Sequence, residues 1–304
     1  PNQKLVKAVM FGLEFGFPLG HIAERRATFN KNHKLTRTQK LVMEEKIREA
    51  SELGYIHGPS DAPQFKNLQV AALGLVPKDP DRPKPDSVDP KDWRMIHDTS
   101  APNGRGANAG IPKDIWFYRW SNIRVIIDLL LKLGPDAWMW ARDWLSAFMQ
   151  IHVHPDDWEL LGMCWRGKYY YYTRTPFGCR ASAGLLEQVQ ELFAWILDYH
   201  YGIRLENGCV TTRYVDDAFG AGRNHERALW SMLQNDRAMR DHGIIDKPSK
   251  RVGPVQVLTT LGVILDVPLQ EARMSPVKIQ KALDILRKIV GRKPPRATDE
   301  ELRK

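Results

Sequence analysis

Residues 209–220 read CVTTRYVDDAFG, and this stretch decides the fold of the 304-residue chain. Two adjacent carboxylates, Asp216 and Asp217, separate two short runs of strand-forming residues. The segment therefore predicts a tight β-hairpin with both acids at its turn. Aspartate is common in turns for structural reasons alone. Two carboxylates at the end of buried strands repel each other, however, unless a cation lies between them.

A third carboxylate, Asp143, ends the short apolar segment 137–143 and is followed by Ser146-Ala147-Phe148. If this predicted strand lies beside the hairpin, three carboxylates gather at one place. Hard oxygen ligands of this kind suit Mg²⁺ or Mn²⁺. Two such ions about 3.5–4 Å apart can clamp the attacking and leaving oxygens of a phosphoryl displacement. The pattern thus favours phosphoryl-transfer chemistry.

The hydrophobic pattern around these acids alternates between strands and helices. A capping box at Thr36 and Gln39 and an N-cap at Ser275 before Pro276 mark two helix starts. We expect helices over 37–53, 121–134, 183–199, 225–242 and 275–290, and strands over 93–97, 165–173 and 256–264. This order resembles a split β-α-β unit, so the expected fold class is α+β, with helices on one sheet face and the other free to carry a site.

Positive charge is concentrated at the two ends of the chain. Residues 1–50 carry ten basic and five acidic residues, and residues 275–304 carry nine and four, which gives +5 in each case. The centre, 51–274, has 26 basic and 27 acidic residues and a net charge of −1. Basic ends suit a polyanionic partner, but they are equally compatible with ordinary solvated surfaces.

Cysteine usage and hydropathy exclude several classes of protein. The three cysteines, at 164, 179 and 209, are widely spaced and form no CxxC motif, which argues against a disulfide framework and a structural zinc site. The longest apolar run, Val125–Leu131, is too short to cross a membrane. We therefore expect a reduced, intracellular protein. The proline-rich stretch 78–91 predicts a surface loop.

Several motifs together resemble, in order and spacing, the polymerase motifs of reverse transcriptases. They span residues 75–78, 93–98, 143–148, 175–178, 214–217 and 261–263. Further segments are similar, more narrowly, to the reverse transcriptases of DIRS-type tyrosine-recombinase retrotransposons. These segments span residues 12–20, 96–102, 150–155 and 248–254. Any one motif is weak, but the ordered set covers nearly the whole chain.

The resemblance implies a right-hand polymerase fold. Fingers would occupy 1–117 and 151–180, palm 118–150 and 181–270, and a partial thumb 275–304. The implied activity is RNA- and DNA-templated addition of dNTPs to a primer 3′-hydroxyl, with two Mg²⁺ or Mn²⁺ ions. The implied partners are a template with its primer and dNTPs, without a membrane, in the cytoplasm or nucleus. RNase H and recombinase modules would lie elsewhere in the parent element.

The resemblance also assigns catalytic roles. Asp143, Asp216 and Asp217, with the backbone carbonyl of Trp144, would hold the two metal ions. Lys250 matches a lysine that could protonate the leaving pyrophosphate. The resemblance makes Asp217 the less essential acid of the hairpin pair, and its alternative role is that of a structural turn residue.

The nucleotide-binding roles fall on other segments. Phe148 would lie beneath the sugar of the incoming nucleotide and exclude a 2′-hydroxyl, although core packing is an alternative role. Arg94 and Lys78 would close on the triphosphate, or else be surface charges. Phe177 and Gly178 would line the nucleotide pocket, where a glycine lets the backbone approach the substrate.

Three positions depart from the family pattern. Ser146 replaces an aspartate, Ala183 a proline and Glu187 a glutamine. The negative charge that Glu187 adds would weaken substrate binding if it faces the cleft. Two other functions stay open. One is a co-opted reverse-transcriptase-like protein that binds nucleic acid or scaffolds a complex without polymerising. The other is an RNA-dependent RNA polymerase, against which Phe148 argues.

Overall fold

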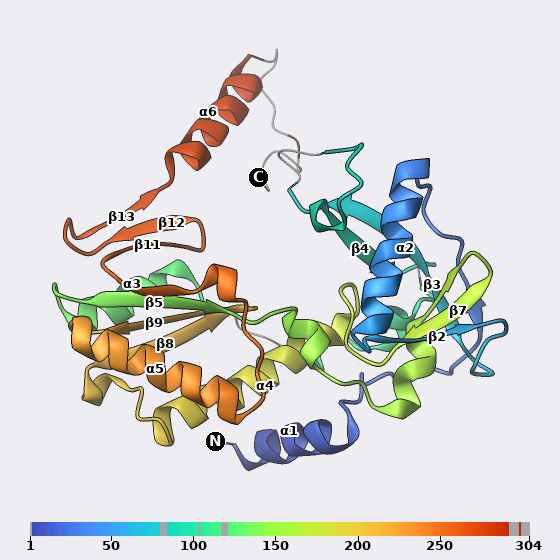
Figure 1. Ribbon diagram of the computed structural model, residues 1–304, viewed down its shortest axis with the longest axis horizontal. Coiled ribbons are helices and arrows are strands. Elements are labelled where there is room, and N and C mark those ends of the chain that lie inside the picture. Colours follow the sequence, from blue (N-terminus) through green and yellow to red (C-terminus); the bar gives the residue numbers. More distant parts are fainter. Residues whose placement is uncertain (1, 80–83, 103, 117–120, 292–297, 299–304) are drawn as a thin grey trace. The chain divides into compact units, whose positions relative to one another are not determined.

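The protein is described from a computed structural model, which places residues 2–79, 84–102, 104–116, 121–291 and 298. Figure 1 shows the order of the elements along the chain. The chain divides into two compact units, the first made of residues 1–119 and 145–195 and the second of residues 120–144 and 196–304. The assignment of fingers, palm and thumb to segments of these units stays a prediction.

The first unit contains a six-stranded mixed sheet. Strand β3 has three partners: it pairs in parallel with β1 and β6 and antiparallel with β4. The remaining pairs, β6 with β7 and β7 with β2, are antiparallel. The strands are β1 (Thr28–Phe29), β2 (Ile56–Ser60), β3 (Gln69–Pro77), β4 (Trp93–Asp98), β6 (Gly162–Trp165) and β7 (Lys168–Tyr172). Part of its core is built from Leu68, Val70, Cys164 and Tyr171.

Two helices of this unit show why their sequences fold as they do. Helix α2 (Arg37–Glu52) starts at the predicted capping box, because the Thr36 hydroxyl accepts the Gln39 amide proton and the Gln39 side chain accepts that of Thr36. Helix α1 (Gln3–Phe15) is capped by Asn2 and ends at Gly16. Sequence analysis did not anticipate α1.

The second unit contains a four-stranded antiparallel sheet in the order β10-β5-β9-β8. Its strands are β5 (Trp138–Asp143), β8 (Cys209–Tyr214), β9 (Asp217–Gly222) and β10 (Val252–Val255). Helix α5 (His225–Asp241) packs on one face of this sheet, where the Trp140 indole donates to the Ser231 hydroxyl at 2.8 Å. The predicted hairpin is therefore present.

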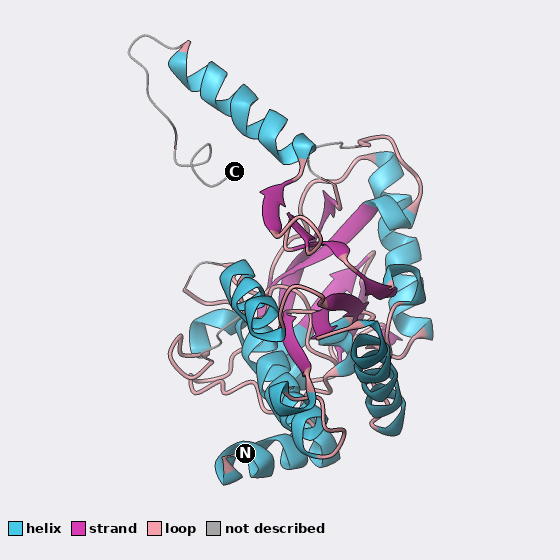
Figure 2. Cartoon of the chain, turned by 90° about the vertical axis from the view of Figure 1, so that its left-hand side faces the viewer, coloured by secondary structure: helices cyan, strands magenta, loops and turns pink. Residues whose placement is uncertain are grey.

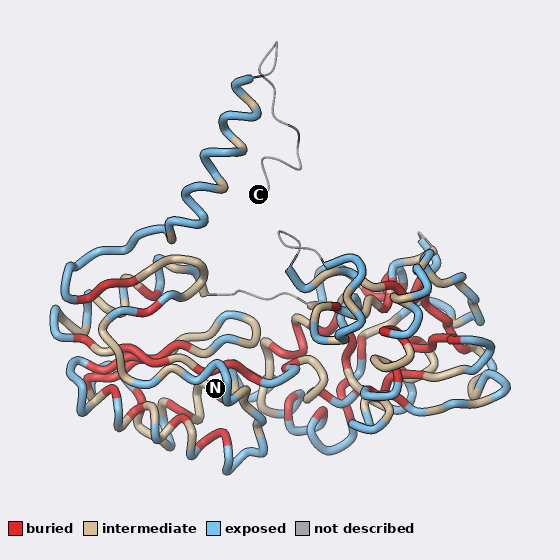
Figure 3. Tube along the Cα trace, turned by 45° about the horizontal axis from the view of Figure 1, so that its top comes forward, coloured by how far each residue is buried: buried red, intermediate tan, exposed pale blue. Residues whose placement is uncertain are grey.

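The opposite sheet face is covered as well, which corrects the expectation of an open face. A second, three-stranded sheet, made of β11 (Val257–Thr260), β12 (Val263–Asp266) and β13 (Glu271–Met274), supplies Leu258 and Leu265 to a core that also holds Met139 and Ala221. Helix α3 (Ile123–Leu133) adds Ile126 to this core. In Figure 3 the strands around this core are red, the colour of buried residues.

Two predicted boundaries are wrong for local reasons. Residues 256–264 form two strands rather than one, because Leu261 and Gly262 adopt positive φ angles of 48° and 76° and turn the chain into the β11–β12 hairpin. Helix α3 is capped by Asn122, whose side chain accepts the amide protons of Arg124 and Val125. Ser121 instead hydrogen-bonds the Thr212 hydroxyl.

The remaining helices agree more closely with the sequence. Helix α4 spans Arg180–Tyr199, and α6 (Pro276–Val290) follows the predicted Ser275 cap. Helix α6 extends from the end of β13, and none of its residues is buried (Figures 2 and 3). Short 3-10 helices are η1 (Pro90–Asp92), η2 (Ala107–Gly110), η3 (Ala147–Gln150), η4 (Pro155–Leu161), η5 (Leu205–Asn207) and η6 (Pro248–Lys250).

Other predictions have mixed outcomes. The three cysteines are buried and free. No helix in the described part of the chain is both long and apolar enough to cross a bilayer. Residues 80–83 of the predicted 78–91 loop and residues 292–297 and 299–304 of the predicted partial thumb lie outside the described residues.

Candidate active site

Asp143 and Asp217 are brought face to face at the end of the four-stranded sheet. They are directly opposite each other in the antiparallel β5–β9 pair, so both side chains lie on the same sheet face. This face is the one opposite α5, because Met139, Ala141 and Asp143 alternate with Trp140 and Arg142 along β5. Long-range strand register, which no local motif encodes, thus assembles the first two acids of the predicted cluster.

Asp216 lies next to them in the two-residue turn of the β8–β9 hairpin. Tyr214 and Asp217 flank this turn as a strand pair, which leaves Val215 and Asp216 as its two central residues. Val215 has a φ of 53°, a conformation that is strongly disfavoured for a β-branched side chain. The Trp144 amide donates to the carbonyl of Asp216 at 2.8 Å. The turn is therefore strained and tied to the end of β5.

Lys250 completes the site. Its ammonium forms an ion pair with the Asp143 carboxylate, whose side chain is only 5% exposed, while half of the lysine side chain is exposed. The hydrogen bond to Asp143 raises the pKa of Lys250 above its usual value. The neighbouring Lys247 amide also donates to the Asp143 carbonyl at 2.8 Å. The structure thus brings Asp143, Asp216, Asp217 and Lys250 together.

The carboxylates carry uncompensated negative charge. Partial burial raises the pKa of Asp217 to about 6, and repulsion from Asp216 and Asp143 adds to this shift against attraction from Lys250. Such a shift is typical of acids that share a site without enough cations. The chemistry of this donor set fits a hard divalent cation.

The side chains as they stand do not yet form a finished metal site. Among the described residues, no group of three or more His, Cys, Asp or Glu side chains is arranged so that it could hold a metal ion. One reason is visible, because the Lys250 ammonium already occupies an Asp143 oxygen. An ion bound to that oxygen would have to displace Lys250.

A pocket of about 290 Å³ opens next to these acids. Asp217, Tyr214 and Lys250 line one part of it. Thr259, Thr260 and Leu261 from the β11–β12 hairpin line another. All of these residues belong to the second unit. Of the three acids, Asp217 therefore borders a hollow, together with Lys250.

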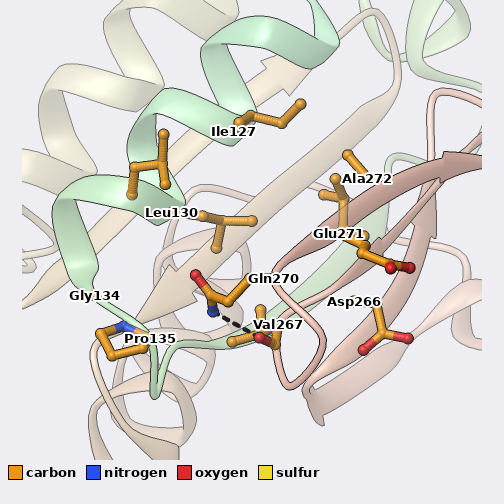
Figure 4. Close-up of a pocket in the computed structure, with 11 residues that line it drawn as sticks. Ile127, Leu130, Gly134, Pro135, Asp266, Val267, Gln270, Glu271 and Ala272 are labelled. Atoms are coloured by element: carbon orange, nitrogen blue, oxygen red, sulfur yellow. Dashed lines mark hydrogen bonds between the residues drawn. The ribbon is translucent and has the colours of Figure 1, made fainter.

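A second hollow of about 240 Å³ lies between α3 and the β12–β13 hairpin (Figure 4). Aliphatic side chains such as Ile127 and Leu130 line it, and the Gln270 side chain donates to the Val267 carbonyl at 2.6 Å. None of the candidate site residues lines this hollow. We assign the chemistry to the carboxylate pocket for this reason.

The predicted nucleotide-binding residues Arg94, Phe148 and Phe177 form a stack within the first unit. The Arg94 guanidinium carbon lies 5.4 Å from the centre of the Phe177 ring. The Phe148 ring meets Phe177 edge-on, with ring centres 4.8 Å apart. Phe177 is 44% exposed, and Phe148 is half-buried. A half-buried ring at the edge of an exposed stack is not a simple core residue.

Gly178 and Lys78 belong to the same unit as these three residues, and Gly178 directly follows Phe177. Gly178 has a φ of 102°, and a β-carbon there would collide with the His97 carbonyl oxygen. Lys78 follows β3, and its amide donates to the Asp92 carbonyl at 2.8 Å. Because Val76 pairs with Arg94 and side chains alternate along an extended strand, we expect Lys78 to share the face of Arg94.

Sequence reasoning missed the residues that hold these groups in place. In the first unit, the Thr99 hydroxyl and the Asn108 amide each donate to the Gly178 carbonyl at 2.7 Å, and the buried Thr175 hydroxyl donates to the Phe148 carbonyl at 2.7 Å. In the second unit, Arg142 forms a two-pronged ion pair with Asp236 of α5. Arg142 immediately precedes Asp143, so this pair fixes the end of β5.

No family model matches the sequence, and no curated protein is similar to it at a significant level. Solved structures do match. They include a foamy viral protease-reverse transcriptase in complex with an RNA/DNA hybrid (TM-score 0.64, 18% identity) and its dRH form in complex with double-stranded DNA (TM-score 0.64, 16% identity). The matches cover 88% of this chain in both cases, but only 31% and 40% of the viral chains.

The protease-reverse transcriptase of prototype foamy virus is also similar, with a TM-score of 0.57, 18% identity and 83% of this chain covered. This chain therefore spans less than half of the length of these viral proteins. At such identities the likeness concerns the fold. The chain has a mixed α/β, reverse-transcriptase-like fold.

Proposed function

We propose that this protein is a reverse transcriptase of a retroelement, which adds dNTPs to a primer 3′-hydroxyl on an RNA or DNA template. The observation that carries the proposal is the pairing of Asp143 with Asp217 beside Asp216, at the end of a sheet in a reverse-transcriptase-like fold. The viral structures with similar folds were determined with an RNA/DNA hybrid or double-stranded DNA, which supports a nucleic-acid partner. The DIRS-type assignment rests on the sequence motifs.

In this proposal Asp143, Asp216, Asp217 and the carbonyl of Trp144 hold two Mg²⁺ or Mn²⁺ ions. Bound ions would lower the pKa of the primer hydroxyl and neutralise the triphosphate and the pyrophosphate. Lys250, now paired with Asp143, would be placed to protonate the leaving pyrophosphate once released from that carboxylate. Positioning and charge stabilisation then supply most of the rate.

The exposed stack of the first unit would select the nucleotide. Arg94, together with Lys78, binds the triphosphate, and Phe177 with Gly178 forms the wall of the nucleotide pocket. The Phe148 ring excludes a ribose 2′-hydroxyl by contact. The fingers, palm and thumb boundaries given above remain part of the proposal, as do RNase H and recombinase modules elsewhere in the parent element.

Primer extension tests the proposal. The wild-type chain should extend oligo(dT) on poly(rA) with dTTP and Mg²⁺ or Mn²⁺, and Asp216→Asn should not. Failure of the wild type to extend, or equal extension by Asp216→Asn, contradicts the proposal. Phe148→Ala should gain the use of rNTPs, and an unchanged preference for dNTPs would refute the role of the ring and reopen the RNA polymerase alternative.

The second candidate is a co-opted protein that binds nucleic acid without polymerising. One observation favours it: Lys250 lies on Asp143, and the described side chains form no finished metal site. The extension assay separates the two functions when it is combined with binding of the same template–primer. Tight binding without extension by the wild type would identify the co-opted protein.

A further inference from the structure

The chain segment that begins with Phe148 and the segment that ends with Phe177 run side by side in the first unit. Their backbones are joined by the Thr175 amide, which donates to the Ile151 carbonyl at 3.0 Å. Both segments belong to the same compact unit. The position of one aromatic ring against the other is therefore set by contacts between these two segments.

The Thr175 side chain adds a second bond between the segments. Its hydroxyl donates to the Phe148 carbonyl at 2.7 Å. The same carbonyl also accepts the Ile151 amide proton at 3.1 Å. Thr175 has no exposed surface, so water cannot readily take the place of its hydroxyl. Loss of the hydroxyl would leave Phe148 tied to the neighbouring segment by backbone contacts alone.

Phe177 is held independently of Phe148, because the carbonyls on both sides of it are fixed. The Pro176 carbonyl accepts the Ser182 hydroxyl at 2.8 Å, and the Gly178 carbonyl accepts the Thr99 hydroxyl at 2.7 Å. The Phe148 ring meets Phe177 edge-on, with ring centres 4.8 Å apart. The bond at its own carbonyl therefore decides how firmly the Phe148 ring is kept in this place.

We propose that Thr175 determines the sugar specificity of the nucleotide pocket, because its hydroxyl holds the Phe148 ring where the ring excludes a ribose 2′-hydroxyl. This inference rests on the proposed function. Thr175 is a positioning residue in it, since its buried hydroxyl acts through the backbone of Phe148 and does not touch the nucleotide. The ligands that it separates are deoxynucleoside and ribonucleoside triphosphates.

The test measures nucleotide binding and not extension. The full chain is bound to a template–primer whose primer ends in a dideoxynucleotide, so that no bond can form. Dissociation constants of dATP and ATP opposite a templating thymine are measured in Mg²⁺ by gel retention of the ternary complex. The wild type should prefer dATP. Thr175→Val keeps the side-chain shape without the hydroxyl, and it should lower this preference about fivefold, the factor that corresponds to one hydrogen bond.

The fivefold change should come from tighter binding of ATP, with the affinity for dATP unchanged. A fold that is merely damaged would weaken the binding of both nucleotides. Thr175→Ala lacks the same hydroxyl and should show the same loss of preference, which keeps the test decisive if Thr175→Val fails to fold. Thr175→Ser retains the hydroxyl and should keep the wild-type preference.

Thr173→Val is the matched control. It is the same substitution two residues upstream, and it removes a hydroxyl that donates to the Gly54 carbonyl at 3.2 Å. This variant should keep the wild-type preference for dATP. A loss of preference equal to that of Thr175→Val would show that the bond to Phe148 has no special role.

The double variant with Phe148→Ala shows whether Thr175 acts through the ring. Phe148→Ala alone should abolish the preference for dATP, and the addition of Thr175→Val should change nothing further. An unchanged preference in both hydroxyl-free variants, or an equal weakening of dATP and ATP binding, overturns the inference.

The outcomes also separate this inference from the proposed function. A preference that depends on Thr175, in a wild-type protein that does not extend primers, would support the role of Thr175 and contradict the polymerase. Extension by the wild type, with a preference that Thr175→Val leaves intact, would support the polymerase and contradict the role of Thr175. A wild type that binds dATP and ATP equally, or binds neither, contradicts that role whether or not it extends primers.

Discussion

Asp143 and Asp217 lie directly opposite each other on neighbouring antiparallel strands, and the first of them is ion-paired with Lys250. Two like charges are thus held together by the sheet and partly neutralised by one cation. Because the two charges repel each other, the end of β5 has to be fixed by other contacts, such as the Arg142–Asp236 ion pair. It also indicates where the fold is most sensitive to substitution.

The Arg142–Asp236 pair is the first sensitive point. Arg142 is buried, and its Nε and Nη2 donate to the two Asp236 oxygens at 2.7 and 2.8 Å. Asp236→Ala leaves a buried guanidinium without its counter-charge, so it should lower the free energy of unfolding by about 3 kcal/mol. Chemical denaturation checks this value.

The control for this variant is Glu271→Ala. Its partner Arg273 is exposed, and loss of this surface pair should lower the free energy of unfolding much less than loss of the buried pair. Equal effects of the two substitutions would show that the buried pair does not hold the end of β5.

His97 makes the stability of the first unit depend on pH. Complete burial lowers the pKa of His97 to about 4, against opposing effects of its hydrogen bond to the Gly162 carbonyl and of Asp98. The unfolded chain takes up a proton near pH 6.5 while the folded chain does not. The resulting stability is therefore complete above pH 6.5 and is lost as the pH falls towards 4, by up to about 3 kcal/mol.

Denaturation of the wild type and of His97→Gln between pH 4 and pH 7.5 measures this effect. The variant should lack most of the slope, whereas His57→Gln, at an exposed position in the same unit, should keep it. A wild-type stability that is flat over this range would contradict the burial of a neutral His97.

Gly178 should not tolerate a side chain. Its φ of 102° and the nearby His97 carbonyl combine backbone strain with a steric collision. Gly178→Ala should lower the melting temperature by several degrees and abolish dNTP binding. Gly104→Ala is the control that measures the backbone strain without a collision. Gly104 has a φ of 76°, and no atom lies within 4 Å of the position that its β-carbon would take. Similar melting temperatures for both variants would argue against the collision.

Because Val215 is strained, we expect its replacement by glycine to raise stability and to lower activity. Val215→Gly removes a strained φ of 53° and should raise the free energy of unfolding by about 1 kcal/mol. The same change frees the turn that carries Asp216 and should reduce primer extension. Arg166→Gly relieves a similar φ of 48° in the first unit and should not affect extension. Full activity of Val215→Gly would show that the strain has no role in positioning Asp216.

Local features of the structure could largely be predicted from the sequence. The hairpin at 209–220, the capping box at Thr36 and the Ser275 cap are each encoded within a few neighbouring residues. Where local signals compete, prediction was less successful. Asn122 rather than Ser121 caps α3. The turn within the apolar run 256–264 was not predicted, because Leu261 adopts a positive φ that its residue type does not favour.

Non-local contacts could not be read from the chain in the same way. Arg142 and Asp236 are 94 residues apart, and Thr99, Asn108 and Thr175 act only through backbone carbonyls of distant segments. The ion pair of Lys250 with Asp143 was equally unforeseen, although both residues were candidates. All of these contacts arise from tertiary packing, which brings together residues that are far apart in the sequence and form no recognisable motif.

Single-nucleotide addition tests the central claim most directly. A DNA primer annealed to an RNA template should be extended by one nucleotide when Mg²⁺ and the complementary dNTP are supplied, and a change of the templating base should change the nucleotide that is used. Asp143→Asn should abolish the product while the protein stays folded and binds the duplex. No templated addition by the wild type, or the same addition by Asp143→Asn, would contradict the account.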